Sequence, residues 1–473
     1  MKDSYLLRED LNKLMKRYTL PCILSLLIGA LYNIVDQIFI ANADYLGSYG
    51  NAANSVVFPL TVIALALATM IGDGCCAYSS ICLGAKKKEE ASSSTANAII
   101  LVIVTSLLLT FIYLTFSDMI LNAFGANVNQ TTFVLAKEYF FYISLGIPFY
   151  MLGQALNPII RSDGSPKYAM FTLLLGGLIN LILDPILIYP LHMGMAGAAI
   201  ATIIGQILAA IFASFYLKRM QYLKLERRSF KINFKLVKEI LSLGMTSFLS
   251  QVSMVFSIAA VNNMALKYGS LDPIFSLSEY AQIPTAVIGI VMKFFQIVIS
   301  VSIGLAAGCI PIIGYNLGAN RKDRVKSLLK KLIIAEAVVG IIALIIFEMF
   351  PNQLINIFGG NNESVYYREF ALKCIRLFMC LLPLSLINKG SFIFLQAMGK
   401  AKESTFLSLL REIILGVGLV IILPKLFALN GLLYFMPLAD LITFIITIYI
   451  LYLVYIELNN ETNDYLNTSA LKA

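Results

Sequence analysis

Apolar runs of about twenty residues recur about twelve times along this chain, and they constrain its fold more than any other feature. A helix rises about 1.5 Å per residue, so about twenty apolar residues cross the roughly 30 Å hydrocarbon core of a bilayer. The runs lie near residues 18–42, 53–83, 95–117, 134–158, 168–190, 195–217, 238–264, 281–316, 328–350, 367–398, 404–427 and 431–456. We therefore predict an all-α polytopic membrane protein.

The composition agrees with a bilayer as solvent and excludes several kinds of site. Charged residues make up 13% of the 473 residues, against about 25% in soluble proteins. One histidine, His192, cannot build a histidine-based metal or acid–base centre, and the seven cysteines lack CxxC spacing. Neither a zinc site nor a disulfide framework is indicated. The segment 1–17 is charged and amphipathic, so we expect no cleaved signal peptide.

The distribution of positive charge predicts the topology. Of the 36 Lys and Arg residues, 27 fall in the termini and loops on one side of the predicted spans or at the span ends beside them, and three fall at the opposite side. The positive-inside rule places both termini and the long basic linker in the cytoplasm. Topology thus accounts for the net charge of +9, and we expect no nucleic-acid partner.

The chain contains an internal repeat. GCCAYSSICLGAKKKEEA from Gly74 aligns without gaps to GCIPIIGYNLGANRKDRV from Gly308, an offset of 234, and Gly164 matches Gly399 at an offset of 235. Six spans per repeat give two parallel halves around a cleft that rocking can open to either side, as in transporters. We predict an N-lobe at 1–217, a cytoplasmic basic linker at 218–237, a C-lobe at 238–456 and a cytoplasmic tail at 457–473.

Two acids inside predicted spans indicate a cation site, because a mid-span carboxylate costs about 2.5–3.5 kcal/mol. Asp36, in YNIVDQIFIA, and Asp184, in GGLINLILDPILIY, lie at matched depth. Asn180 shares a helix face with Asp184, and Thr202 and Tyr139 lie at a similar level. Two such carboxyl groups together either take up a proton or bind a cation. A structural ion pair remains the alternative.

Pro185 follows Asp184 and leaves the Leu181 carbonyl without its helical partner. That oxygen either faces the site or merely marks a bend in the span.

The second half carries charges of both signs inside its spans. Mixed charges favour structural pairs, such as Asp440 or Glu412 with Lys389 or Lys293, over a second cation site. Asp73, in the IGDG of the second span, either faces the cleft or lies where glycines let helices touch. The spans of this half carry, among other charges, Lys293, Lys373, Arg376, Lys389, Arg411, Glu412 and Asp440.

The succession DQIFIA, LGAKKKEEA, NPIIRSDGSPK, GGLINLILDPILIY, GMAGAAIAT and IGLAAGCIPIIGYNLGANRKDRV resembles the multidrug and toxic compound extrusion (MATE) family. The similarity covers essentially the whole chain and is greatest to bacterial multidrug export proteins. The resemblance implies twelve helices in two pseudo-symmetric six-helix bundles, in a bacterial inner (plasma) membrane. It also implies that cations enter as drugs leave, which is the basis of antibiotic resistance by efflux.

The resemblance also assigns residues. It implies a cation site at Asp36, Asn180, Asp184 and Thr202, which offers oxygens to Na⁺ or carboxylates to a proton. Where some family members have acids in spans 7 and 10, this chain has Gln251 and Lys389, so we expect no C-lobe site of that kind. No cofactor beyond the coupling ion is expected. The predicted substrate contacts are Asn33, Gln37, Tyr139, Asn157, Gln251 and Lys293.

The expected function is a monomeric, ion-coupled multidrug efflux antiporter that exports amphipathic, often cationic compounds and lies among membrane lipids. A flippase for lipid-linked saccharides is the main alternative, because Lys293, Lys389 and Arg411 offer charges to a pyrophosphate. A membrane enzyme is disfavoured because the chain has one histidine and no GxSxG motif. A passive channel is disfavoured because duplication around buried carboxylates suits alternating access better.

Overall fold

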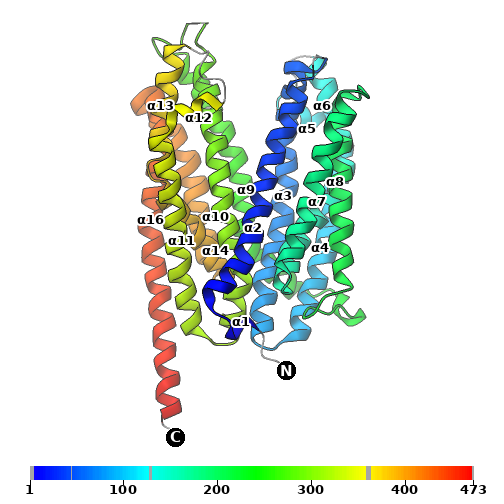
Figure 1. The fold of residues 1–473 in the computed structure, drawn as a ribbon, viewed down its shortest axis with the longest axis vertical. Coiled ribbons are helices and arrows are strands. Elements are labelled where there is room, and N and C mark those ends of the chain that lie inside the picture. The colour runs from blue at the N-terminus through cyan, green and yellow to red at the C-terminus, as the bar shows by residue number, and fades with distance from the viewer. Residues whose placement is uncertain (1–4, 44, 127–129, 278, 358–363, 471–473) are drawn as a thin grey trace. The chain divides into compact units, whose positions relative to one another are not determined.

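The computed structural model describes residues 5–43, 45–126, 130–277, 279–357 and 364–470, and within these ranges it contains helices and no strands. Figure 1 shows long helices joined by short connections. The helices are α1 (Tyr5–Arg8), α2 (Leu11–Ala41), α3 (Gly47–Gly84), α4 (Lys88–Thr115), α5 (Ser117–Ala123), α6 (Gln130–Ser162), α7 (Pro166–Ile188), α8 (Gly194–Leu217), the 3₁₀ helix η2 (Arg227–Phe230), α9 (Phe234–Gly269), α10 (Ile283–Gly318), α11 (Lys322–Met349), α12 (Pro351–Ile357), α13 (Val365–Met379), α14 (Leu382–Ala397), α15 (Ala401–Leu409), the π-helix η4 (Leu410–Val417) and α16 (Gly418–Ala470).

The predicted all-helical membrane fold is confirmed. Ten helical segments of the described chain are long and apolar enough to cross a bilayer, and α13 with α14 forms one further span bent by 43°. The last segment, Ala401–Asn459, has 59 residues, about 90 Å of helix and far more than one crossing needs. Non-helical backbone at Phe427 and Ala428 divides it, at the predicted boundary between the last two spans. The described residues thus provide twelve passes.

That final turn depends on one glycine. Ala428 has a positive φ of 51°, and the chain then doubles back so closely that a Cβ at Gly431 would overlap the Leu423 carbonyl oxygen. Glycine is the residue that allows such an approach, so Gly431 permits the last two spans to be joined by a minimal turn.

The chain forms two compact units. Unit 1 consists of residues 1–251, 307–320 and 396–401, and unit 2 of residues 252–306, 321–395 and 402–473. In unit 1, α3 packs on α4 and α6, α6 packs on α8, and α7 packs on both α2 and α8. In unit 2, α16 packs on α11 and α13. Buried apolar residues form a core in each unit, including Phe140 and Leu156 in unit 1 and Phe378 and Met436 in unit 2.

Positions matched by the internal repeat have matching backbones. Gly164 after α6 and Gly399 after α14 both have a positive φ, 94° and 78°. Lys86 and Asn320, which follow α3 and α10 at an offset of 234, are also left-handed, with φ of 63° and 59°. Left-handed residues commonly end helices, so the two motifs end their helices in the same way.

The repeated LGA motifs also lie against each other within unit 1. A Cβ added at Gly84 of α3 would overlap the Tyr315 carbonyl oxygen of α10, and one added at Gly318 of α10 would overlap the Ile81 carbonyl oxygen of α3. In each contact the glycine of one motif copy meets the residue that lies three positions before the glycine of the other copy. The backbones of α3 and α10 therefore touch through two equivalent glycine contacts, which explains why glycine stands at both positions.

Candidate cation site

Four of the residues predicted for a cation site lie together in unit 1, on three helices. Asp36 comes from α2, Asn180 and Asp184 from α7, and Thr202 from α8. Three of these residues are almost fully buried: Asp36 is 8% exposed, Asp184 is 1% exposed and Asn180 is 3% exposed. Thr202 is half-buried. The structure thus brings together residues that lie up to 166 positions apart.

Asn180 links the two neighbouring groups of this cluster. Its Nδ2 donates to Asp184 Oδ1 at 3.1 Å and to Thr202 Oγ1 at 3.2 Å, and the Thr202 hydroxyl donates to the Ala198 carbonyl at 3.0 Å. The Asp36 and Asp184 carboxyl groups interact directly with each other. The amide therefore holds Asp184 in place beside the second acid.

The carboxyl pair has oxygens without protein partners. Asp36 Oδ1 and Asp184 Oδ2 are buried and make no hydrogen bond, and no described Lys or Arg forms an ion pair with either acid. Burying unpaired carboxylates is costly. A proton or a small cation would remove that cost, and oxygen ligands of this kind suit a hard cation such as Na⁺.

Two glycines set the distance between α7 and α8 beside this cluster. A Cβ at Gly205 would lie 2.5 Å from the Gly176 carbonyl oxygen and 3.5 Å from Asn180 Cβ. Small residues let helix backbones approach closely in membranes. The close approach at Gly176 and Gly205 thereby brings Asn180 of α7 within hydrogen-bonding distance of Thr202 of α8.

The predicted substrate contacts are more dispersed. Tyr139 is buried on α6, and Gln37 is half-buried on α2, one position from Asp36. Asn157 hydrogen-bonds outside the cation cluster. Its Nδ2 donates to the Ala169 carbonyl at 2.7 Å and joins α6 to α7. Gln251 and Lys293 are half-buried on α9 and α10. The side chain of Asn33 lies outside the described part of the structure.

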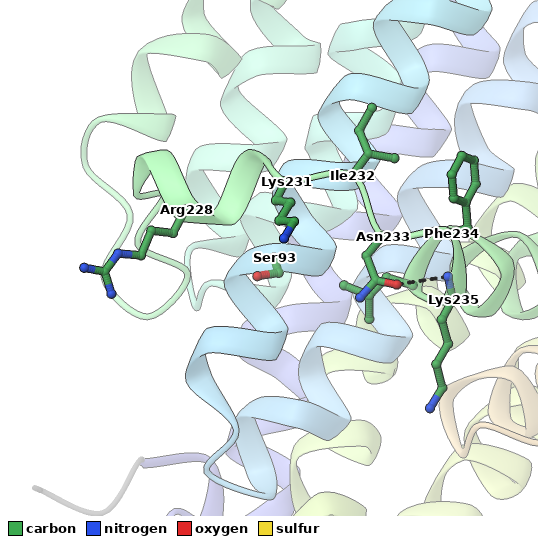
Figure 2. Close-up of a pocket in the computed structure, with 8 residues that line it drawn as sticks. Ser93, Arg228, Lys231, Ile232, Asn233, Phe234 and Lys235 are labelled. Atoms are coloured by element: carbon green, nitrogen blue, oxygen red, sulfur yellow. Dashed lines mark hydrogen bonds between the residues drawn. The ribbon is translucent and has the colours of Figure 1, made fainter.

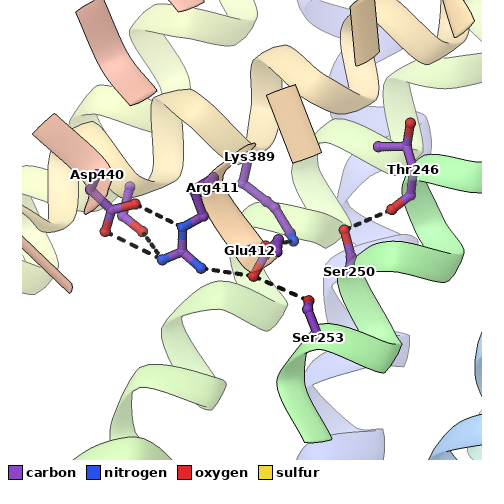
Figure 3. Close-up of polar contacts among 8 residues, drawn as sticks. Thr246, Ser250, Ser253, Lys389, Arg411, Glu412 and Asp440 are labelled. Atoms are coloured by element: carbon purple, nitrogen blue, oxygen red, sulfur yellow. Dashed lines mark hydrogen bonds and ion pairs between the residues drawn. The ribbon is translucent and has the colours of Figure 1, made fainter. Parts of the chain in front are cut away.

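The second half has a network of opposite charges instead, in unit 2 (Figure 3). Lys389 Nζ lies 2.8 Å from Glu412 Oε1, Arg411 Nη1 lies 2.9 Å from Glu412 Oε2, and Arg411 Nε lies 2.9 Å from Asp440 Oδ1. Ser253 donates to Glu412 Oε2 at 3.4 Å. Of the alternative pairings named from the sequence, Glu412 with Lys389 is present. Two cations and two anions make this network formally neutral, unlike the Asp36–Asp184 pair.

Comparison with known proteins identifies the family. The family model described as MatE matches residues 21–186 and 259–422, most of the chain. The chain belongs to the MatE family. Membership makes it a membrane transporter and not an enzyme.

Relatives of this MatE chain match it end to end. It is 27% identical to the multidrug export protein MepA of Staphylococcus aureus strain MSSA476, over 98% of this chain and 99% of that protein. It is also 27% identical to MepA of Staphylococcus haemolyticus strain JCSC1435, over 96% of each.

Solved structures share the fold. A crystal structure of MATE in complex with MaL6 superposes with a TM-score of 0.88 at 23% identity, over 97% of this chain and all of that one. An outward-facing multidrug resistance MATE family transporter superposes with a TM-score of 0.87 at 23% identity, over 97% and 99%. The MATE fold expected from the resemblance is confirmed.

Asp73 of this MatE chain takes part in a buried network that joins helices within unit 1. Asp73 Oδ1 lies 3.4 Å from Arg161 Nη2, and Asp73 Oδ2 accepts from Ser247 Oγ at 2.9 Å. Arg161 Nη1 also donates to Cys22 Sγ at 2.8 Å, and Gln396 Nε2 donates to Ser247 Oγ at 3.3 Å. Of the two interpretations of Asp73, the structure supports the helix contact.

Sequence reasoning missed two buried acids. Glu336 of α11 is fully buried, and neither of its carboxyl oxygens has a hydrogen-bond partner. Its isolation in the apolar run of the ninth span was the signal that could have found it. Asp163 follows α6 and accepts from the backbone N–H groups of Gln221, Tyr222 and Leu223, each at 2.8 Å. No local pattern shows that this acid anchors the linker.

Proposed function

We propose that this MatE protein is a secondary active multidrug efflux antiporter, which exports amphipathic, often cationic organic compounds in exchange for H⁺ or Na⁺. The observation that carries the proposal is the buried Asp36–Asp184 pair, which has free carboxyl oxygens and no cationic partner in the described chain. The other two buried networks described above each include a cationic partner for their acids, Arg161 in one and Lys389 with Arg411 in the other.

Coupling follows from the energetics of this pair. Two buried carboxylates repel each other and are poorly solvated, so a bound cation stabilises the conformation that holds them together. A cation drives a conformational change only if it binds one state better than another. We infer that Asn180 and Thr202 hold Asp184 in the geometry that favours cation binding. The cation then biases the protein toward the conformation that releases the drug.

The substrate class is supported by the full-length relatives, which are named multidrug export proteins. We propose contacts with substrate for the residues predicted from the sequence, among which Asn157 already uses its amide to join α6 to α7. The basic loops support a plasma-membrane orientation with both termini in the cytoplasm.

The charge network of unit 2 weakens the flippase alternative. A site for a lipid-linked pyrophosphate needs positive charges available to the ligand. Lys389 and Arg411 instead form ion pairs with Glu412 and Asp440 at 2.8–2.9 Å, so their charge is already balanced within the protein.

The test is gradient-driven dye transport in everted membrane vesicles. A fluorescent cationic dye is supplied outside, a pH gradient or a Na⁺ gradient is imposed separately, and dye uptake is followed for the native chain, Asp36→Asn and Asp184→Asn. We expect one gradient to drive uptake in the native chain and both substitutions to abolish the dependence on it, because each removes an ionisable oxygen donor.

The matched control is Asp118→Asn, the same chemical change at an exposed acid that pairs with Lys137 at the surface. It should leave transport unchanged. Dye uptake that ignores both gradients and both site substitutions would refute the antiporter. Full coupling in Asp184→Asn alone would place the cation on Asp36.

A further inference from the structure

A pocket of about 580 Å³ lies where the linker enters the second repeat, and its function is not explained by cation coupling (Figure 2). Ser93 of α4, Arg228 of η2 and residues 231–236 line it. Three of the lining side chains are cationic, namely Arg228, Lys231 and Lys235, and no acidic side chain is among the described lining residues. Figure 2 shows the Lys231 side chain directed toward Ser93, with the Arg228 and Lys235 side chains extending away from it on opposite sides. The pocket is therefore electropositive.

The backbone that forms the pocket is fixed to α4. Asn97, almost fully buried, donates to the Lys231 carbonyl at 3.1 Å, and its Oδ1 accepts from the Asn233 N–H at 2.9 Å. The Asn233 side chain in turn accepts from the Lys235 N–H at 3.0 Å at the start of α9. These bonds fix the backbone that carries Lys231 and Lys235 before any ligand arrives, which lowers the entropic cost of binding.

Apolar side chains flank the positive charges without being covered. Phe234 is 84% exposed and Ile232 is 58% exposed, and Phe234 is the most exposed large hydrophobic side chain of the described chain. The pocket lies at the level where two membrane spans begin, α4 at Lys88 and α9 at Phe234. Aromatic and basic side chains at the ends of spans occupy the interface between headgroups and acyl chains.

We propose that this pocket binds the phosphate headgroup of an anionic phospholipid, with Lys231 at the phosphate beside Ser93, Arg228 and Lys235 adding positive charge on either side, and Phe234 and Ile232 against the upper acyl chains. A soluble phosphate would use the cations but would leave Phe234 and Ile232 in water. A basic pocket beside exposed apolar groups at a bilayer surface is the combination that recognises an acidic lipid.

The test uses the full-length protein in detergent, titrated with phosphatidylglycerol and followed by native mass spectrometry to obtain the Kd of the first bound lipid. Phosphatidylcholine with the same acyl chains and inorganic phosphate are the other two probes. A juxtamembrane cation contributes about 1 kcal/mol, or about fivefold in affinity. The triple variant Arg228→Gln/Lys231→Gln/Lys235→Gln should therefore bind phosphatidylglycerol about a hundredfold more weakly, and Phe234→Ser should also weaken binding.

Lys86→Gln/Lys87→Gln/Lys88→Gln is the matched control, because it removes the same charge from the neighbouring loop outside the pocket. It should retain tight binding. Equal loss in both triple variants, equal affinity for phosphatidylcholine, or displacement of the lipid by inorganic phosphate would each overturn the proposal. Asp36→Asn should bind the lipid normally, so the result is independent of cation coupling, and dye uptake by the pocket variants shows that they fold.

Discussion

Arg411 offers the sharpest test of the charge network in unit 2. Its guanidinium bonds Asp440 through Nε and Nη2, at 2.9 and 3.3 Å, and bonds Glu412 through Nη1 at 2.9 Å. The side chains of all three residues are at most 15% exposed. Arg411→Met keeps much of the side-chain volume but removes the charge, so Asp440 remains buried without a cation.

The cost follows from that uncompensated charge. Removing one partner of a buried ion pair typically destabilises a protein by about 3–5 kcal/mol. Arg411→Met/Asp440→Asn removes the stranded charge as well and leaves the Lys389–Glu412 pair intact, so we expect the loss to fall to about 1–2 kcal/mol. Arg411→Met/Glu412→Gln has the same net charge as that double variant, but it separates Lys389 and Asp440 from their partners. We expect it to be at least as unstable as Arg411→Met.

The assay is unfolding of the purified protein by sodium dodecyl sulfate in mixed micelles, monitored by circular dichroism. The expected order of stability is native, then Arg411→Met/Asp440→Asn, then the other two variants, with Arg411→Met/Glu412→Gln no more stable than Arg411→Met. If Arg411→Met/Asp440→Asn is no more stable than Arg411→Met, local charge balance is not what Arg411 provides, and the reasoning is refuted. Gradient dependence should persist in that double variant, because the network is distinct from the cation pair.

Two smaller changes test how elements of unit 1 are positioned. Gly205→Ala should reduce dye transport severalfold and lower the free energy of unfolding by about 1–3 kcal/mol, because its Cβ would lie 2.5 Å from the Gly176 carbonyl oxygen. Gly153→Ala is the control: a Cβ there would have its nearest neighbour at 3.7 Å, so this variant should behave as native in the same dye assay. Asn97→Ala should speed tryptic cleavage of the linker, because two hydrogen bonds worth about 2 kcal/mol together are lost. Ser93→Ala should leave the cleavage rate unchanged. Equal rates in both variants would contradict the role of Asn97 in fixing the linker.

The sequence was sufficient to predict the helical membrane fold and the clustering of the four cation-site residues. Apolar run length gives the spans, and acids are rare enough inside spans that Asp36 and Asp184 stand out at once. It was insufficient for Arg161, which follows the predicted span 134–158 and so counts as a loop residue by sequence, but is only 5% exposed and lies beside Asp73. A residue near a span end has the same sequence context whether it faces water or a neighbouring helix.

The partners of Arg411 could not be predicted for a different reason. Arg411 and Glu412 are adjacent in sequence, and neighbouring residues of an ideal α-helix do not face each other. Here both lie in the π-helix η4, and their side chains make an ion pair at 2.9 Å. No propensity distinguishes a π-helix from an α-helix in an apolar run, so this geometry appears only in three dimensions.

The reciprocal glycine contact of α3 and α10 has a consequence for the history of the chain. Gly84 meets residue 315, Gly318 meets residue 81, and an offset of 234 converts one contact into the other. The surface is therefore self-complementary, as in an isologous interface between identical subunits. A single repeat carrying this motif would therefore present the same glycine surface to a second copy of itself, so a contact of this kind is compatible with an origin by duplication. Neither glycine can therefore be replaced more easily than the other, because a side chain added at either position would push α3 and α10 apart.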